Sequence, residues 1–494
     1  METLVPSGHR FDWRGFLLVI GIAFAGAVSF QGSRGLYETT EGRYAECARE
    51  TMASGDFDDP ILNGQPHWTK PPLTYMAIMA GTRALGNTAW GARAYLVLAM
   101  VLAAGAIWLA GTSIWGPKAG LWAGLVFSTS PFMAGAAGVV SADLLTTLWV
   151  AAAMAAFWHG YARRSPFPLL AMWAFLGLGF MTKGPPALLV PAASLPVAGL
   201  LLRRAGTWKV PAGLPWAGLV LFLLLGAGWY VAEAKHTPGL LSYWLGEELV
   251  GRNVSGEFHR NPGLRFAFTM YLPILLLGTG PWLPLVLWRG RPLKNGWPKD
   301  DAPVWSKAAG WSLLAGVAIP FAVFSLSTSK LPLYLVPLFV PLSLILGRRI
   351  DVLIARGRLQ ARTARIAAGG FLVLIVAGKG ILAHIDKPKD MTRLAAALEP
   401  VLARDGNPPL YTATGRYLNG LEFHLDRRIE FIQPEEIFGH MADRLKSGED
   451  PRYVMTKRNW KRVSAGAPVG LRPESLGRHW LFLAPIDVAG GPEN

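Results

Sequence analysis

Charged side chains capable of acid–base chemistry and anion binding interrupt a chain of 494 residues in which 52% are apolar and only 16% charged. A carboxylate can accept the proton of an attacking hydroxyl, and a lysine or arginine can stabilise negative charge that grows on a leaving group. The sequence therefore offers the parts of a group-transfer site. The carboxylates considered are Glu38, Glu41, Glu46, Asp143, Glu247 and Glu248, and the cations are Arg43, Lys70, Lys183, Arg252 and Lys330.

The elements that must position these residues are long apolar stretches. Soluble domains carry about 25% charged residues, so this composition is typical of a polytopic membrane protein. One run is too long for a single span, and Lys183-Gly184-Pro185-Pro186 should break it into two helices. We predict about 11 to 13 transmembrane helices. The apolar stretches lie at about 16–30, 93–112, 119–134, 143–162, 167–202, 212–232, 264–288, 308–326, 331–347 and 366–384.

The formal net charge of +16 is compatible with nucleic-acid binding until the positions of the basic residues are considered. They gather in every second connection between the predicted spans, which is the pattern of cytoplasmic loops. This distribution places the N-terminus in the cytoplasm and the C-terminus outside, and it removes the argument for nucleic acid. The basic residues concerned are Arg10, Arg14, Lys118, Arg163, Arg164, Arg203, Arg204, Lys209, Arg289, Arg291, Lys294, Lys299, Lys307, Arg348, Arg349, Arg356, Arg358, Arg362 and Arg365.

The opposite side receives two long connections, about 31–92 and 233–263, and the C-terminal tail. In the first, Thr40 is a candidate N-cap for an amphipathic helix over 41–52, and Lys70-Pro71-Pro72 begins a second helix; both should lie at the membrane interface. The tail, 385–494, lacks span-length apolar runs. Short β-type runs at 409–412, 428–432, 453–456 and 480–484 and a helical run at 435–445 predict a separate small α/β domain, apart from a membrane part over 1–384.

Several motifs are similar to those of a known family. They are Glu41-Gly42-Arg43-Tyr44-Ala45-Glu46, Ser54-Gly55-Asp56-Phe57, Leu62-Asn63-Gly64-Gln65-Pro66, Lys70-Pro71-Pro72-Leu73, Phe180-Met181-Thr182-Lys183-Gly184-Pro185, Gly228-Trp229-Tyr230, Gly280-Pro281-Trp282 and Ser329-Lys330-Leu331-Pro332-Leu333-Tyr334. Over about 15–347 the chain resembles the GT-C membrane glycosyltransferases, in particular the bacterial aminoarabinose (lipid A) transferases and protein O-mannosyltransferases.

The resemblance implies transfer of one sugar from a polyprenyl phosphate, undecaprenyl phosphate in bacteria, on the outer face of the inner membrane. The implied acceptor is lipid A, another envelope glycan or lipid, or a protein. In this family an acidic residue of the first outer loop acts at the reaction centre, within an Asp-Glu pair. Here the pair is Thr40-Glu41, so Glu41 or Glu38 must replace the missing aspartate, although a neighbouring residue on a helix points about 100° away.

We predict Glu41 and Asp143 as catalytic residues, with a helix N-cap as the alternative role of Asp143. Lys183 either binds the donor phosphate or simply extends to the outer interface. Tyr334 lies four residues after Lys330 on the same helical face, and its hydroxyl would hydrogen-bond the phosphate unless Tyr334 serves only as an interfacial aromatic residue. The resemblance adds donor-binding roles for Arg43, Lys70, Arg252 and Lys330. Further candidates are Glu38, Tyr44, Glu247, Glu248 and His259.

No cofactor is firmly implied, and we predict no tightly held metal. His259 with a nearby carboxylate would be the best candidate for a divalent ion, but Thr69 stands where some relatives place a glutamate ligand. Two other functions remain open. A transporter or flippase of polyprenyl-linked sugars would place charges near the membrane midplane and often shows inverted repeats, whereas the charges here lie at the outer ends of spans. A non-catalytic relative would explain the missing aspartate.

Overall fold

The computed structural model describes residues 11–207, 213–255, 261, 263–289, 303–385, 387–468, 471, 473–477 and 479–484. The chain forms two compact units. The helical unit consists of Met1–Gln31, His67–Ala77 and Arg93–Ile381. The mixed unit consists of Gly32–Pro66, Ile78–Ala92 and Leu382–Asn494. The first outer loop therefore belongs largely to the same unit as the C-terminal segment.

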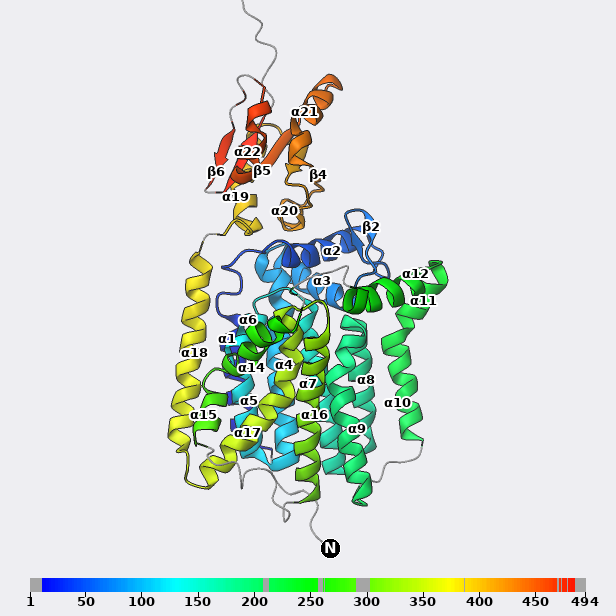
Figure 1. Cartoon of the computed structure of the whole chain (residues 1–494), viewed down its shortest axis with the longest axis vertical. Helices are drawn as coiled ribbons and strands as arrows, with labels where there is room; N and C mark the ends of the chain where they lie inside the picture. Colours follow the sequence, from blue (N-terminus) through cyan, green and yellow to red (C-terminus); the bar gives the residue numbers. More distant parts are fainter. Residues whose placement is uncertain are drawn as a thin grey trace, which may run out of the picture. The chain divides into compact units, whose positions relative to one another are not determined.

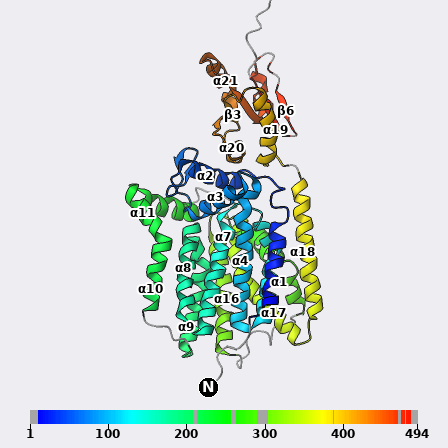
Figure 2. The ribbon, with the colours of Figure 1, turned by 180° about the vertical axis from the view of Figure 1, so that it is seen from behind.

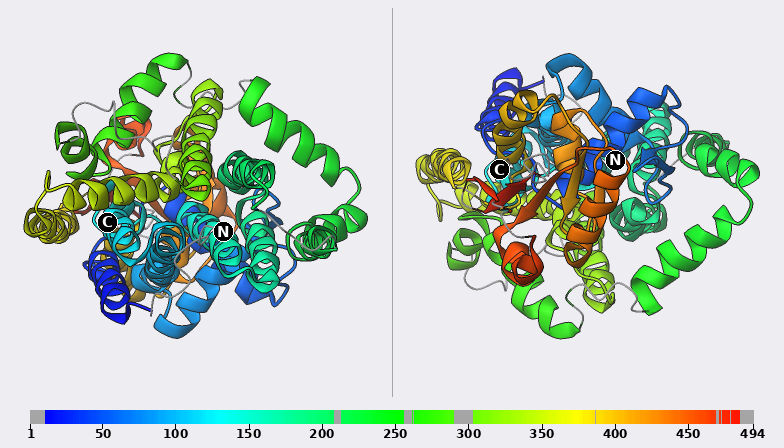
Figure 3. Two further views of the ribbon diagram at one scale, coloured as in Figure 1. Left: turned by 90° about the horizontal axis from the view of Figure 1, so that it is seen from below. Right: turned by 90° about the horizontal axis from the view of Figure 1, so that it is seen from above.

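The helical unit is a bundle in which most of the longer helices run in similar directions, whereas the helix over Phe339–Ala355 is inclined to them (Figures 1 and 3). Among the described residues, five helices are long and apolar enough to cross a membrane, or six if the bent pair Leu264–Leu277 and Trp282–Arg289 is one span. The main helices are α1 (Trp13–Val28), α4 (Ala89–Trp115), α5 (Pro117–Ser128), α6 (Pro131–Ala136), α7 (Ala142–Arg163), α8 (Pro166–Lys183), α9 (Leu189–Arg204), α10 (Leu214–Phe222), α11 (Gly228–His236), α12 (Leu240–Tyr243), α14 (Leu272–Leu277), α15 (Trp282–Arg289), α16 (Val304–Leu326), α17 (Phe339–Ala355) and α18 (Ala361–His384).

The predicted break in the longest apolar run is confirmed. Helix α8 ends at Lys183, Gly184 has a φ of 72°, and the short 3-10 helix η1 (Pro185–Leu188) leads into α9. A positive φ is costly for residues with a Cβ, so glycine is well suited to this turn. Three other apolar stretches, for which no break was predicted, are also interrupted. Proline interrupts helical hydrogen bonding at or near each break. The breaks separate α5 from α6, α14 from α15 at an angle of 79°, and the 3-10 helix η6 (Pro332–Leu338) from α17.

A lysine links the first and last long helices of the helical unit. The Nζ of Lys379 on α18 donates hydrogen bonds to the carbonyl oxygens of Gly26 and Ala27, at 3.0 and 2.9 Å, near the C-terminal end of α1. Figures 1 and 2 show α1 and α18 side by side from opposite directions. A cation at this position satisfies carbonyls that have no partner in the last turn of a helix.

The C-terminal part of the mixed unit contains a five-stranded sheet in the order β4 (Glu430–Ile432), β3 (Leu410–Ala413), β5 (Arg452–Thr456), β7 (Trp480–Leu483), β6 (Glu474–Leu476). The first three strands are parallel, and β7 and β6 are antiparallel to their neighbours. Four strands lie within two residues of the predicted runs; β6 was not predicted. The helices are α19 (Met391–Arg404), α20 (Asn419–Leu425), α21 (Ile437–Lys446) and α22 (Lys457–Val463).

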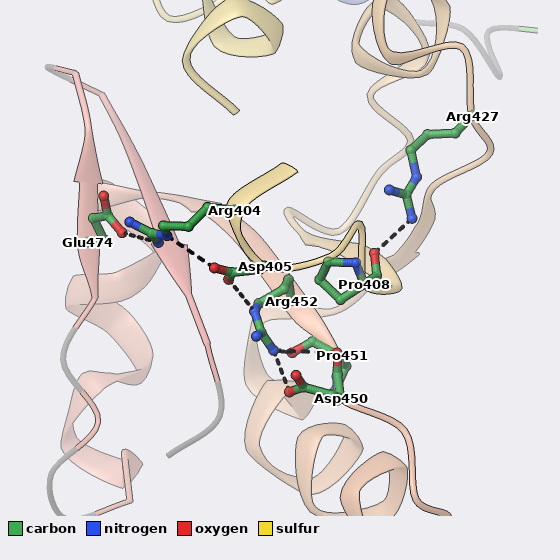
Figure 4. Close-up of polar contacts among 8 residues, drawn as sticks. All are labelled: Arg404, Asp405, Pro408, Arg427, Asp450, Pro451, Arg452 and Glu474. Atoms are coloured by element: carbon green, nitrogen blue, oxygen red, sulfur yellow. Dashed lines mark hydrogen bonds and ion pairs between the residues drawn. The ribbon is translucent and has the colours of Figure 1, made fainter. Parts of the chain in front are cut away.

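Alternating side chains form a core on each face of this sheet. Leu410 and Val454 face the core under α19, and their neighbours Tyr411 and Tyr453 face the core under α21. This is the period of two expected for a sheet covered on both faces. At one end of the sheet, Arg452 binds Asp405 at 2.9 Å and also pairs with Asp450; Arg404 extends the network to Asp405 and Glu474 (Figure 4).

The first outer loop adds a polar helix and a hairpin to the mixed unit. Helix α2 (Thr40–Ser54) begins one residue earlier than predicted, and its N-cap is Thr39 rather than Thr40, with no hydrogen bond from the cap side chain. The hairpin of β1 (Ile61–Leu62) and β2 (Gln65–Pro66) turns at Asn63-Gly64, both with positive φ, as a tight turn requires. Helix α3 (Leu73–Leu85) begins just after Lys70-Pro71-Pro72.

Candidate functional site

The charges that interrupt the apolar runs meet where α7 begins and α8 ends. Asp143 is the second residue of α7 and is 7% exposed, and the Nζ of Lys183, the last residue of α8, donates a hydrogen bond to its Oδ1. The hydroxyl of Ser141 caps α7, which excludes Asp143 as the N-cap. Because the Lys183 side chain is only 11% exposed and ion-paired, simple extension to the interface does not describe it.

An aromatic ring completes this group. The Nζ of Lys183 lies 5.0 Å from the ring centroid of Tyr334, within the range of a cation–π interaction. The end of α8 is also fixed by Thr182, whose hydroxyl accepts a hydrogen bond from the Trp149 indole at 3.0 Å and whose carbonyl accepts one from Thr74 at 3.1 Å. Asp143, Lys183 and Tyr334 therefore form a defined cluster, which we call the α7–α8 cluster.

The prediction that Lys330 and Tyr334 share one face of a helix is wrong. It precedes the 3-10 helix that contains Tyr334, so the two residues are not one turn apart on an α-helical face. Lys330 is 1% exposed and its Nζ donates to the carbonyl oxygen of Ser327 at 2.5 Å. It forms no ion pair with any residue in the described ranges. A buried ammonium without a carboxylate partner is costly, and binding an anion would offset that cost.

Two contacts link the segment around Lys70 to the start of the second long connection. Lys70 pairs with Glu248 at 3.6 Å, and the Trp244 indole donates to the carbonyl oxygen of Trp68 at 2.9 Å. Glu248 lies in the π-helix η3 (Trp244–Ser255), where Glu247 is exposed. Arg252 also belongs to η3, but its side chain is outside the described part of the structure, as is the whole of His259.

The carboxylates of the first outer loop have structural partners within the mixed unit. Both oxygens of Glu41 are engaged, one by Arg34 at 2.7 Å and the other by the Tyr37 N–H at 3.0 Å, and the residue is 2% exposed. The other candidates on this loop differ in exposure: Arg43 is half-buried and Tyr44 is buried. Sequence reasoning missed Arg34. The only indication in the sequence was that Arg34 is a cation that closely follows the first apolar run.

Glu38 and Glu46 are also buried. Glu38 accepts a hydrogen bond from the Gly420 N–H, and burial raises the pKa of Glu38 to about 7. Glu46 pairs with Arg49 through two hydrogen bonds of 2.6 and 2.8 Å. Among the described residues no group of three histidine, cysteine, aspartate or glutamate side chains is arranged to hold a metal ion. Because His259 is not among them, the absence of a tightly held metal stays a prediction.

Comparison with known proteins agrees with the architecture. Residues 69–230 match the family described as dolichyl-phosphate-mannose-protein mannosyltransferase. Over 362 residues the chain is 31% identical to the undecaprenyl phosphate-alpha-4-amino-4-deoxy-L-arabinose arabinosyl transferase of Edwardsiella ictaluri, covering 71% of this chain and 63% of that relative. The chain thus spans less than two thirds of the relative's length.

Two solved structures share the fold. ArnT from Cupriavidus metallidurans bound to undecaprenyl phosphate superposes with a TM-score of 0.74 and 21% identity, covering 97% of this chain and 99% of that one. The oligosaccharyltransferase of Archaeoglobus fulgidus gives a TM-score of 0.51 with 12% identity, over 90% of this chain and 69% of that one. The chain therefore has the fold of GT-C glycosyltransferases and resembles the aminoarabinose transferases in sequence, as its motifs predict.

Proposed function

We propose that this protein transfers a single sugar from an undecaprenyl phosphate-linked donor to a hydroxyl of an acceptor. The donor sugar is of the 4-amino-4-deoxy-L-arabinose class, by likeness to the relative from Edwardsiella ictaluri. The acceptor class is lipid A, another envelope glycan or lipid, or a protein. The observation that carries the proposal is the position of Lys183, a largely buried ammonium that contacts both the Asp143 carboxylate and the Tyr334 ring.

In the proposed reaction, the acceptor oxygen bonds to the anomeric carbon of the sugar while the bond from that carbon to the phosphate oxygen breaks. The acceptor proton passes to a carboxylate, and undecaprenyl phosphate leaves with the additional negative charge. General-base assistance contributes about 10²–10⁴-fold, and electrostatic stabilisation of the leaving group typically more. Cations that bind the phosphate should therefore contribute more to the transfer rate than the general base does.

We assign phosphate binding to Lys183, Lys330 and Lys70, three cations of the helical unit that lie near the ends of helices. Asp143 orients the Lys183 ammonium, and Glu248 orients Lys70. The ring of Tyr334 contacts the Lys183 ammonium in a cation–π interaction. Glu41 stays our proposed base. Its Arg34 partner fixes the carboxylate and supports a defined orientation. Arg43 and Arg252 remain additional donor-binding candidates.

The proposed placement is the bacterial inner membrane, with 11 to 13 spans, α2 and α3 at the outer interface and the C-terminal α/β segment in the periplasm. Helix α7 supports this orientation, because Asp143 begins it and Arg163 ends it. Helix α9 likewise ends in Arg203 and Arg204. Lys183 is the last residue of α8, which leads into the start of α9, so it belongs to the opposite side of the membrane from Arg203 and Arg204. Clusters of arginine at one set of helix ends are typical of the cytoplasmic side.

The test is transfer of radiolabelled sugar by the purified protein in detergent, with undecaprenyl phosphate-linked aminoarabinose as donor and lipid A as acceptor. We expect labelled acceptor from the wild type and none when the donor lipid is replaced by a nucleotide sugar. Movement of label across sealed vesicles without transfer in detergent would instead identify a transporter. Mass spectrometry of envelope glycolipids from cells with and without the gene identifies the acceptor, and identical spectra would favour a non-catalytic relative.

A further inference from the structure

Helix α2 of the first outer loop packs against α20 of the C-terminal segment, as Figure 1 shows for these two elements of the mixed unit. The two backbones approach closely at a pair of glycines. A Cβ on Gly42 would lie 2.5 Å from the backbone nitrogen and 2.8 Å from the Cα of Gly420, far inside contact distance. Gly42 is helical and has no positive φ, so close approach rather than backbone conformation explains the glycine.

Side chains and backbone groups secure this contact along its length. Glu38, 4% exposed, accepts a hydrogen bond from the Gly420 N–H, one of the donors that the start of α20 cannot satisfy internally. At the same end, the Asn419 amide donates to Asn63 Oδ1 at 2.7 Å. At the other end, Arg49 binds Asp426, the C-cap of α20, at 2.9 Å.

The chain preceding α2 is held in the same way. The Glu38 N–H donates to the carbonyl oxygen of Lys389 at 3.0 Å, and the Met391 N–H donates to that of Leu36 at 3.0 Å. Gly35 donates to the Asp390 carboxylate at 3.3 Å. These bonds fix the path of the loop immediately before the helix that carries Glu41 and Arg43.

We propose that α20 and residues 389–391 position the first outer loop for sugar transfer, and that Glu38 is a positioning residue and not a base. Its carboxylate is buried and binds a backbone N–H of α20, so it acts on the reaction through the placement of α2. This inference rests on the proposed function only for its activity measurement, since the docking of α2 on α20 is measurable without any substrate.

The experiment compares Gly42→Ala, Glu38→Ala and Glu38→Gln in the full chain. Gly439→Ala and Glu399→Ala are matched controls in the same unit, because a Cβ at Gly439 meets nothing within 4 Å and Glu399 is exposed. Hydrogen exchange reports on residues 36–66 and 418–428, and transfer assays give kcat and KM. Displacement of a reacting group by about 1 Å costs on the order of 10²-fold in rate, so Gly42→Ala and Glu38→Ala should lower kcat by that factor.

We expect both variants to accelerate exchange in residues 36–66 and 418–428, with exchange in α7 and α8 and the KM for donor unchanged. Glu38→Gln should stay near wild type, because the amide oxygen still accepts the Gly420 hydrogen bond. Unchanged exchange in Gly42→Ala and Glu38→Ala would overturn the docking, and a Glu38→Gln variant as inactive as Glu38→Ala would show that Glu38 is a base. If the wild type transfers no sugar, the proposed function fails while the exchange data still decide the docking.

Discussion

Replacing Asp143 with asparagine tests whether the α7–α8 cluster binds a phosphate or only stabilises the fold. The exposed fractions of the Lys183 and Asp143 side chains are 11% and 10%, so the substitution leaves a largely buried ammonium without its counter-charge. Removing one partner of a buried ion pair costs about 3–5 kcal/mol, whereas removing both charges is often nearly neutral. We therefore expect Asp143→Asn to destabilise the protein and Asp143→Asn/Lys183→Met to recover most of the stability.

Activity and donor binding should follow a different pattern. If Lys183 stabilises the leaving phosphate, both Lys183→Met and the double variant lose on the order of 10²–10³-fold in transfer rate, even where stability recovers. Undecaprenyl phosphate at 100 times its Kd should stabilise the wild type by about 2.7 kcal/mol, and the variants without Lys183 should lose most of this gain. Thermal unfolding in detergent with and without the lipid measures both effects.

Asp351→Asn is the matched control, because Asp351 pairs with Arg348 at 3.1 Å within α17, outside the proposed site. It should change neither lipid stabilisation nor transfer by more than a few-fold. A double variant that transfers sugar at the wild-type rate would refute the reasoning, since the pair would then be purely structural.

Three further predictions concern single residues. Lys330→Met should weaken binding of undecaprenyl phosphate at least tenfold. It should not lower the unfolding temperature, because it removes a buried charge that has no ion-pair partner among the described residues. Unchanged lipid binding would exclude Lys330 from the phosphate site. Glu248→Gln should reduce the transfer rate less than tenfold, because its partly exposed ion pair with Lys70, at 3.6 Å, contributes about 1 kcal/mol or less. A loss beyond 10²-fold would mean that Glu248 contacts the reacting groups. Burial, together with the nearby negative charge of Glu422, raises the pKa of Glu38 from 4.5 to about 7, against the Gly420 hydrogen bond and the positive charges of Arg416 and Arg43. The mixed unit should therefore lose up to about 3 kcal/mol of stability as pH rises from 4.5 to 7; hydrogen exchange should show this slope in the wild type and a flat profile in Glu38→Gln.

The sequence predicts the parts of the fold that depend on local patterns. Lys183 and Asp143 stood out because a charge in an apolar run needs a partner, and two successive helices joined by a short connection place such residues at the same end. The break at Gly184-Pro185 was readable from residue types alone. The breaks before Pro131 and Trp282 were missed, because hydropathy counts apolar residues and does not register a change in helix direction.

The contacts of the first outer loop with other segments could not be predicted from local sequence patterns. Glu41 was identified from its motif, but its pairing with Arg34 depends on how an irregular segment folds back before α2. The contact of Gly42 with Gly420 joins two elements at opposite ends of the chain, and no period or composition in a single sequence connects them. The C-terminal segment therefore looked like an independent domain, although it shares a compact unit with residues 32–66.

The bond between Glu38 and Gly420 also fixes an order of events during synthesis. The two residues are 382 positions apart, so the first outer loop emerges long before the helix on which it packs. At about 5–20 residues per second, the loop waits on the order of 20 to 80 s for α20 to be made. Until then, Gly42 and Glu38 lack Gly420, the residue against which both are placed in the folded protein. A ribosome that stops within the last long helix would release a chain whose apolar helices are nearly complete but whose first loop has nothing to fold against.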